Sequence, residues 1–285
     1  MTSLPARGDS VIELTPANTQ EIPARRGQGG MQSKAGHRTL VFGLRLLALV
    51  VALICWELVV RVGLIPEFYI SRPYNVLLFL IGYVTGPQFV PDSMTTIRET
   101  LAGFVLGSTF GILGGLLLGR FTLLELVARP YVAAIQSLPK VALAPMFILW
   151  FGLGSQSKIF LGAVVVFFIV LVSTEAGVRA VERDILMTTR ALAATNRQLY
   201  LKVVLPGSLP SVFAGLRLGA VYALLASIVG QMIAAREGWG LRITYYSQTF
   251  EAAGVFSILI IIGVFASAFG GILIYAERRL LRWQD

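Results

Sequence analysis

Long apolar runs constrain this chain more than any other feature of its sequence. A helix needs about 20 mostly apolar residues to cross the hydrocarbon core of a bilayer. Hydrophobic residues make up 56% of the 285 residues and charged residues only 14%, which is too apolar for a soluble domain. We therefore predict an all-α polytopic membrane protein. Six spans are expected, at about 40–62, 97–119, 128–152, 159–178, 209–234 and 254–275.

The third run is the least regular of the six. It carries Pro130, Pro139, Lys140 and Pro145, so we expect a kinked or split helix. Irregular backbone at membrane depth is tolerated where protein or a water-filled cavity satisfies its polar groups. The stretch 138–152 is therefore a candidate pathway segment, and a helix that is kinked only for packing is the alternative.

The remaining segments divide the chain into four regions. Residues 1–39 have few large apolar side chains, which predicts a disordered tail. The region 40–95 combines the first span with the segment 66–92, which is too short between its prolines to span and predicts an interfacial helix on the outer face. The region 96–278 would form a five-helix core with a loop at about 179–208, and 279–285 a C-terminal tail.

The formal charge of +9 is explained better by membrane topology than by nucleic-acid binding. The 24 Lys and Arg residues are spread along the chain instead of clustering with aromatics, which argues against nucleic-acid binding. If the amino terminus is cytoplasmic, fifteen of them lie in inner segments and six in outer segments. The positive-inside rule then places both termini and the 179–208 loop in the cytoplasm.

Several kinds of chemistry are excluded by what the sequence lacks. With Cys55 the only cysteine and His37 the only histidine, we expect no disulfide, no metal centre and no catalytic triad. No phosphate-binding loop of the G-x-x-x-x-G-K-[ST] type occurs. An ion-coupled carrier would need acidic groups deep in the membrane, and Glu99 is expected at the start of the second span. The residues alone favour a transporter component and leave a carrier, a channel and an enzyme open.

Glycines recur at helical spacing along the second span. Gly103, Gly107 and Gly111 stand four residues apart, and Gly115 and Gly119 continue the series. Small residues at this spacing let two helix backbones approach closely in lipid. The pattern predicts tight helix packing and carries no functional information.

The 179–208 loop combines an apolar stripe with a basic face. Four apolar residues recur at steps of seven, seven and four and would share one face of a helix: Ile185, Leu192, Leu199 and Val203. We expect the helix to end near Pro206, with Ser208 capping the next one. Such a helix can pack on its own protein, lie on the membrane surface or fill a groove on a partner.

From about Leu40 to Trp283 the chain resembles the permease subunits of the nitrate, sulfonate and taurine importers of the ATP-binding-cassette class. The resemblance is carried by CWELVVRVGLIPEF at 55–68, LPKVALAPMFILWFGLGSQSK at 138–158 and AERRLLRWQD at 276–285. The family's loop pattern is E-A-A, three residues, G, nine residues, I, one residue, L-P. Here Val203 and Leu205-Pro206 fit, whereas Met187 replaces the Glu, Thr188 and Thr189 the alanines, and Ala193 the Gly.

The resemblance implies a type I importer permease fold with six transmembrane helices and a cytoplasmic coupling helix, in the inner membrane. It implies a homodimer, an ATPase subunit that binds the ATP, a periplasmic or extracellular binding protein, and no cofactor or catalytic residue in this chain. The ATPase-coupling residues would be Met187, Thr188, Thr189, Arg190, Leu192, Ala193, Arg197, Leu199, Val203, Leu205 and Pro206. Candidates for the translocation path are Met146, Phe147, Trp150 and Gln231, with helix packing as their alternative role.

Overall fold

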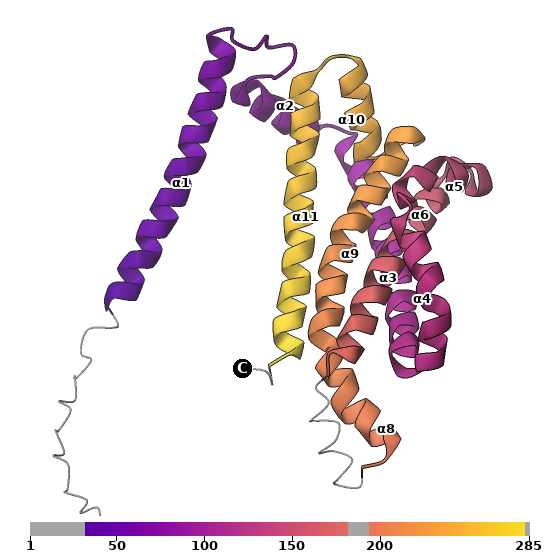
Figure 1. The fold of residues 1–285 in the computed structure, drawn as a ribbon. Coiled ribbons are helices and arrows are strands. Elements are labelled where there is room, and N and C mark those ends of the chain that lie inside the picture. Colours follow the sequence, from indigo (N-terminus) through magenta and orange to yellow (C-terminus); the bar gives the residue numbers. More distant parts are fainter. Residues whose placement is uncertain (1–31, 182–193, 283–285) are drawn as a thin grey trace, which may run out of the picture. The chain divides into compact units, whose positions relative to one another are not determined.

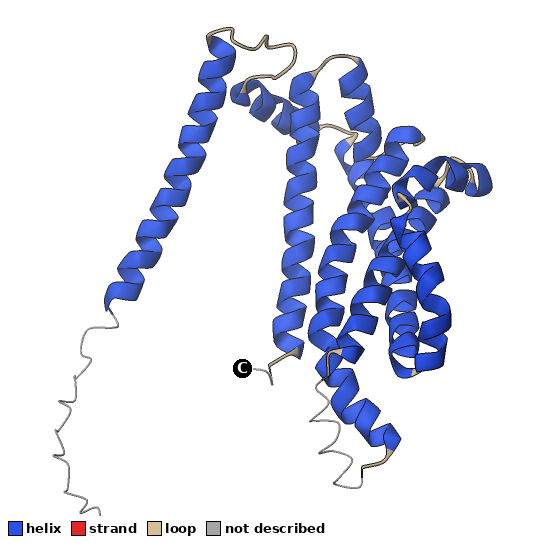
Figure 2. Cartoon of the chain, in the orientation of Figure 1, coloured by secondary structure: helices blue, strands red, loops and turns tan. Residues whose placement is uncertain are grey.

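The computed structural model describes residues 32–181 and 194–282, and these form helices joined by loops (Figure 2). The expected N-terminal tail up to residue 31, part of the coupling loop (182–193) and residues 283–285 lie outside the described residues. By its contacts the chain divides into two units, Met1–Ala52 and Leu53–Asp285. Within the described ranges, five helices are long and apolar enough to cross a membrane, and six when one bent pair is counted as a span.

Helix α1 (Gln32–Arg61) is the first of these spans. It begins at Gln32, whereas the sequence placed the end of the tail at residue 39. From Leu40 to Leu58 its large apolar side chains are mostly exposed. A helix that is apolar all round is suited to a lipid environment.

The centre of the second unit is formed by α3 (Phe89–Arg120), α6 (Ser155–Arg179) and α9 (Leu205–Ile233), with α6 packed against both neighbours (Figure 1). The expected glycine series lines the contact between α3 and α6. A Cβ added at Gly107 would lie 2.4 Å from the carbonyl oxygen of Ala163, and one at Gly115 2.5 Å from Thr174 Cβ. The predicted close helix packing is thus confirmed.

Changing Gly107 to Ala is expected to destabilise the fold, because the added methyl group meets the rigid backbone of α6. Overpacking of this kind costs about 1–3 kcal/mol. Gly263→Ala is the matched control: no atom lies within 4 Å of its added Cβ. Gly-to-Ala on such an open helix face is expected to be neutral or to stabilise by up to ~1 kcal/mol. Thermal unfolding of the two purified variants in detergent tests this, and equal melting temperatures would contradict it.

The irregular third run is split, as predicted. Helix α4 (Thr122–Ser137) ends before Pro139, a 3-10 turn covers Lys140–Leu143, and α5 (Ala144–Phe151) continues at an angle of 80° to α4. Pro139 lacks a backbone N–H, and the residue before it is in an extended conformation at ψ 137°. This segment is a broken span or a re-entrant loop, not the single helix over 128–152.

Three further helices complete the unit. The segment predicted to hold an interfacial helix contains α2 (Pro73–Thr85), which has Pro73 in its first turn and is too short to span. Helix α10 (Trp239–Gln248) follows α9, and α11 (Ala252–Leu280) contacts α2, α9 and α10. A cluster of buried side chains fills the space between these helices: Tyr83, Leu224, Ile228, Trp239, Tyr246 and Ile258.

The expected helix break at Pro206 is absent. Helix α8 (Asn196–Leu199), a π-helical turn at Tyr200–Val204 (labelled η2) and α9 run on without a gap to Ile233. The ring of a proline clashes with the carbonyl four residues before it, and the wider π turn directly precedes Pro206 in the first turn of α9. Ser208 does not cap a helix; its Oγ donates to the carbonyl of Leu205 at 2.8 Å.

Candidate functional site

A buried polar cluster joins α3 to α9 and α10, and we call it the α3–α9–α10 polar cluster. It comprises Asp92, Ser93, Thr96, Glu99, Ser227, Gln231, Gly238, Trp239, Gly240 and Arg242. Asp92 is fully buried and is its anchor. Its carboxylate accepts from Tyr83 Oη at 2.8 Å, from the Gly238 N–H at 2.7 Å and from Arg242 Nε at 2.6 Å.

The first backbone N–H groups of α10 are held by side chains of the cluster. After the Gly238 N–H, which binds Asp92, the Trp239 N–H donates to Thr96 Oγ1 at 3.0 Å and the Gly240 N–H to Gln231 Oε1 at 3.0 Å. A helix leaves these donors without intrahelical partners, and its N-terminus favours negative charge. The carboxylate of Asp92 therefore fixes the start of α10 on α3.

Glycine is required twice at this junction. Gly238 has φ 119°, and a Cβ there would lie 2.5 Å from Cδ of Gln231. A Cβ on Gly240 would lie 2.3 Å from the carbonyl oxygen of Ile228. The loop from α9 into α10 can therefore reach the polar side chains only with glycine at both positions.

Tyr83 supports Asp92 from α2. Burial raises the pKa of the Tyr83 hydroxyl, and the hydrogen bond to Asp92 raises it further. The hydroxyl therefore stays protonated and donates to Asp92, which links α2 to the cluster.

Glu99 and Gln231 form the part of the cluster that lies deepest along α3. Gln231 is fully buried and donates from Nε2 to Glu99 Oε2 at 2.7 Å; Ser227 donates to the same oxygen at 3.2 Å. Glu99 itself is 3% exposed. Because α3 begins at Phe89, Glu99 lies about 15 Å from the first residue of the helix.

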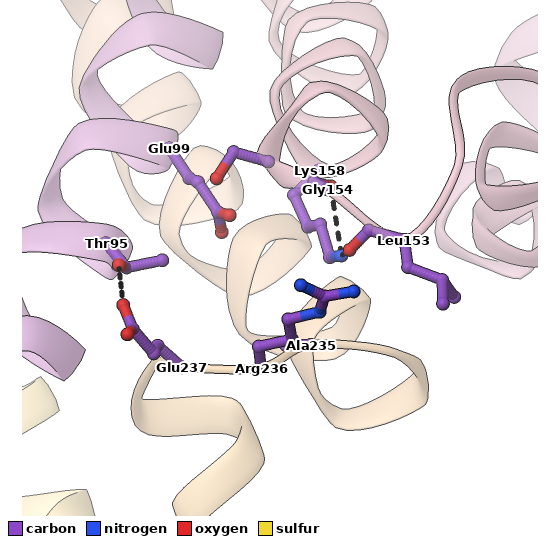
Figure 3. A pocket seen from close by; sticks show the side chains of 9 residues that line it. Thr95, Glu99, Leu153, Gly154, Lys158, Ala235, Arg236 and Glu237 are labelled. Atoms are coloured by element: carbon purple, nitrogen blue, oxygen red, sulfur yellow. Dashed lines mark hydrogen bonds between the residues drawn. The ribbon is translucent and has the colours of Figure 1, made fainter.

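Beside this cluster lies a charged pocket of about 630 Å³, lined by Thr95, Glu99, Leu153, Gly154, Ser155, Lys158, Ala235, Arg236 and Glu237. Its volume is in the range of small-molecule sites. Figure 3 shows the carboxylates of Glu99 and Glu237 on the left of the pocket and the cationic groups of Lys158 and Arg236 on the right. The pocket therefore offers both signs of charge on facing walls.

Lys158 is an unusual member of this pocket because it is only 2% exposed. Its Nζ donates to the carbonyl of Leu153 at 2.6 Å and to that of Gly154 at 3.1 Å, just before α6 begins. Among the described residues, no carboxylate lies within salt-bridge distance of this ammonium group. A buried charge without an ionic partner is costly, so such groups are frequently functional.

Three of the four candidates for the translocation path lie on α5, and the fourth, Gln231, lies on α9. On α5, Met146 and Trp150 are 46% and 62% exposed, whereas Phe147 is buried against α6 and α9. Gln231 belongs to the polar cluster. None of the four lines the charged pocket.

The charged residues of the site were missed, although the sequence carries a signal for some of them. Asp92, Thr96 and Glu99 are spaced four and three residues apart and so share one face of α3; Ser227 and Gln231 are likewise four apart on α9. Two polar stripes on otherwise apolar helices indicate a buried contact between them. No sequence pattern places Lys158, which lies in the first turn of α6, or Arg236, which lies between α9 and α10.

Among the coupling residues, those from Met187 to Ala193 lie outside the described residues. The described part begins with a capping box, in which Thr195 accepts from the Gln198 N–H and the Gln198 side chain accepts from the Thr195 N–H. Thr195 is extended, so the helix that carries Leu199 begins at Asn196. Ile185 and Leu192, the other half of the expected apolar stripe, lie outside the described residues.

The side chains after the cap divide into two faces. Leu199 is buried within the chain itself, whereas Arg197 and Leu201 are exposed. Val203, Leu205 and Pro206 are half-buried. Tyr200 ties this segment to α3, because its hydroxyl donates to the Leu116 carbonyl at 2.9 Å and its ring lies 4.9 Å from the Arg120 guanidinium.

The chain is similar to known proteins by a family model, by sequence and by fold. The family described as binding-protein-dependent transport system inner membrane component matches residues 107–282. A putative aliphatic sulfonates transport permease of Bacillus subtilis is 29% identical, over 98% of both chains. A formylaminopyrimidine transport permease of Halalkalibacterium halodurans is also 29% identical, over 81% of this chain and 92% of its own. In fold, the chain is similar to the inward-facing MetNI methionine transporter, with a TM-score of 0.59 and 19% identity over 70% of this chain and 96% of that one.

Proposed function

The chain belongs to the family of binding-protein-dependent transport system inner membrane components, and from this premise we propose that it forms the path for nitrate, a sulfonate, taurine or a similar small solute. The chain is a multi-pass inner-membrane permease subunit of an importer of the ATP-binding-cassette class. The proposal concerns the solute, the arrangement of subunits and the residues that couple them.

The observation that supports this solute class best is the similarity to the aliphatic sulfonates permease over nearly the whole of both chains. Relatives of comparable identity are named for other solutes, among them a formylaminopyrimidine. Substrate choice in this family rests largely on the binding protein that delivers the solute. The solute class therefore has to be tested with the cognate binding protein in place.

The family implies an ATPase subunit and a solute-binding protein as partners. We infer that two copies of this chain pair around the path and that ATP binds to the ATPase alone. With both termini cytoplasmic, the 179–208 loop faces the ATPase, and α10 and the charged pocket lie toward the binding protein. The excess of Lys and Arg in the inner segments supports this orientation.

Uptake is expected to depend on ATP and not on an ion gradient. In proteoliposomes that contain this chain, its ATPase and its binding protein, taurine or alkanesulfonate entry should persist with a protonophore and stop when ATP is withheld. An ATPase variant that lacks the phosphate-loop lysine is the control for hydrolysis. Vesicles with this chain alone should take up nothing.

An ion-coupled secondary carrier is the second candidate, because Glu99 is an ionisable group buried inside a membrane helix bundle. In such a carrier, Glu99 would gain and lose a proton during transport. Uptake by the chain alone, driven by a proton or sodium gradient and abolished by Glu99→Gln, would overturn the importer proposal in favour of a carrier.

A further inference from the structure

The charged pocket carries equal numbers of opposite charges, and this balance is informative about its ligand. Glu99 and Glu237 supply two carboxylates, and Lys158 and Arg236 two cations. We propose that the pocket binds a small solute that carries both an ammonium and an acidic group, with the two ends bound on opposite walls. This inference rests on the proposed function, because it takes the pocket to be part of the solute's path.

The cationic wall is suited to an oxyanion. Arg236 is exposed at the mouth of the pocket, and among the described residues it has no acidic partner within salt-bridge distance. Its planar guanidinium can donate two parallel hydrogen bonds to a sulfonate or carboxylate. Lys158 lies beside it, and with two donors given to backbone carbonyls a third remains.

The start of α6 lies on the same wall and adds to its positive potential. Gly154 and Ser155 line the pocket, and no side chain caps the helix there. The N-terminus of a helix carries a partial positive charge and unpaired N–H groups. The helix therefore strengthens a site that the two side chains already define.

The acidic wall is suited to an ammonium group. Both hydrogen bonds that Glu99 accepts from α9 go to Oε2, and the carboxylate points into the pocket in Figure 3. Glu237 accepts one hydrogen bond, from Thr95 at 3.2 Å, and is otherwise exposed. Each carboxylate thus keeps acceptor capacity for a bound cation.

A ligand with one charge fits this pocket poorly. A simple anion such as nitrate would be attracted by the two cations and repelled by the two carboxylates. A simple amine would be attracted by the carboxylates and repelled by the cations. Repulsion from the facing wall offsets the attraction in both cases. Only a ligand with both charges gains from both walls. It would also give Lys158 and Glu99 an ionic contact at close range, which neither has with another described residue.

The test uses three probes that share a two-carbon skeleton: taurine, ethanesulfonate and ethylamine. Their binding to the purified full-length chain in lipid nanodiscs is measured by equilibrium dialysis, without ATPase or binding protein. Taurine should bind at least about tenfold more tightly than either single-charge probe. The variants are Glu99→Gln and Arg236→Gln, with Arg98→Gln as the control, because Arg98 is exposed on α3 and does not line the pocket.

The two pocket variants should shift the preference of the pocket toward different single-charge probes. Glu99→Gln should weaken taurine binding and strengthen ethanesulfonate binding, since the repelling carboxylate is gone. Arg236→Gln should weaken taurine and strengthen ethylamine, and Arg98→Gln should leave all three affinities unchanged. Unchanged melting temperatures show that the variants are folded.

No preference for taurine, no binding of taurine at millimolar concentration, or equal effects of Arg98→Gln and Arg236→Gln would overturn the two-charge site. The proposed function is tested separately by ATP-dependent uptake. If uptake requires ATP while the probes bind alike, only the site assignment fails. If the probes bind as expected while ATP is without effect, the importer proposal fails and the site remains.

Discussion

Asp92→Ala is expected to cost about 3–5 kcal/mol of stability, the largest loss from any single change considered for this chain. The carboxylate is fully buried and accepts three hydrogen bonds, one of them from a guanidinium at 2.6 Å. Its removal leaves Arg242 as a half-buried cation without its partner and the Gly238 N–H without an acceptor. Unfolding of the purified chain, followed by near-ultraviolet circular dichroism against temperature, measures the loss.

Glu67→Ala is the matched control for this change. Glu67 also pairs with an arginine, Arg72 at 3.2 Å, but both side chains are more than one third exposed. Exposed pairs contribute about 0–1 kcal/mol because water and salt screen them. Asp92→Asn should fall between the two, since it keeps the shape and one acceptor oxygen. If Asp92→Ala melts within a few degrees of Glu67→Ala, then Asp92 does not anchor α10.

Removing the hydrogen bonds of Asp92 should also affect the charged pocket. Ala235, Arg236 and Glu237 lie between α9 and α10, and Asp92 binds the next residue, Gly238. Once that hydrogen bond is gone, the loop is held only by its neighbours. Asp92→Asn, which should remain folded, is therefore expected to weaken taurine binding although Asp92 does not line the pocket.

The spans were predictable from the sequence because lipid imposes a simple requirement on them. A run of about 20 apolar residues has to satisfy its backbone internally, and only a helix does this within one segment. The glycine series on α3 was predictable for a related reason, since small residues at a spacing of four are what close helix contact needs. The ends of the helices were predicted less accurately: α3 begins at Phe89, eight residues before the start of the expected span at 97.

The charged site was not predictable because it is made by contacts between distant segments. Glu99 and Gln231 are 132 residues apart, and Asp92 and Arg242 150 residues apart. In the sequence each of these charges lies near the end of an apolar run, where charges are ordinary, and the polar stripes on α3 and α9 do not show which segments they contact. Only the packing of α3 against α9 and α10 shows that these ends are buried together.

The loop before α9 shows where a local rule is overridden. Proline normally ends a helix, and the sequence therefore predicted a break at Pro206. Instead, the π turn at Tyr200–Val204 precedes the proline, and the helix continues. As a result, residues 196–233 form one continuous helical segment, from the coupling segment to Gln231 in the polar cluster, and it changes direction between α8 and α9 (Figure 1).

The continuity of this helical segment leads to a prediction about coupling, which rests on the importer proposal. If the ATPase moves the loop as a lever, the movement has to pass through Tyr200–Val204 to reach the pocket. Replacing Leu201 and Lys202 together by glycine should weaken the helix there by about 1–2 kcal/mol. Both residues are exposed, so little burial is lost. We expect roughly a tenfold fall in ATP-driven uptake, with ATP hydrolysis by the assembled complex retained.

Alanine at the same two positions distinguishes an effect of helix stiffness from an effect of side-chain contact with the ATPase. The alanine pair removes the same side chains but keeps the helix, because alanine has the highest helix propensity. Uptake should therefore survive in the alanine pair and fall in the glycine pair. Equal losses in both would mean that Leu201 and Lys202 contact the ATPase directly. Normal uptake in the glycine pair would show that the movement reaches the pocket by another route, such as Tyr200 and its bond to α3.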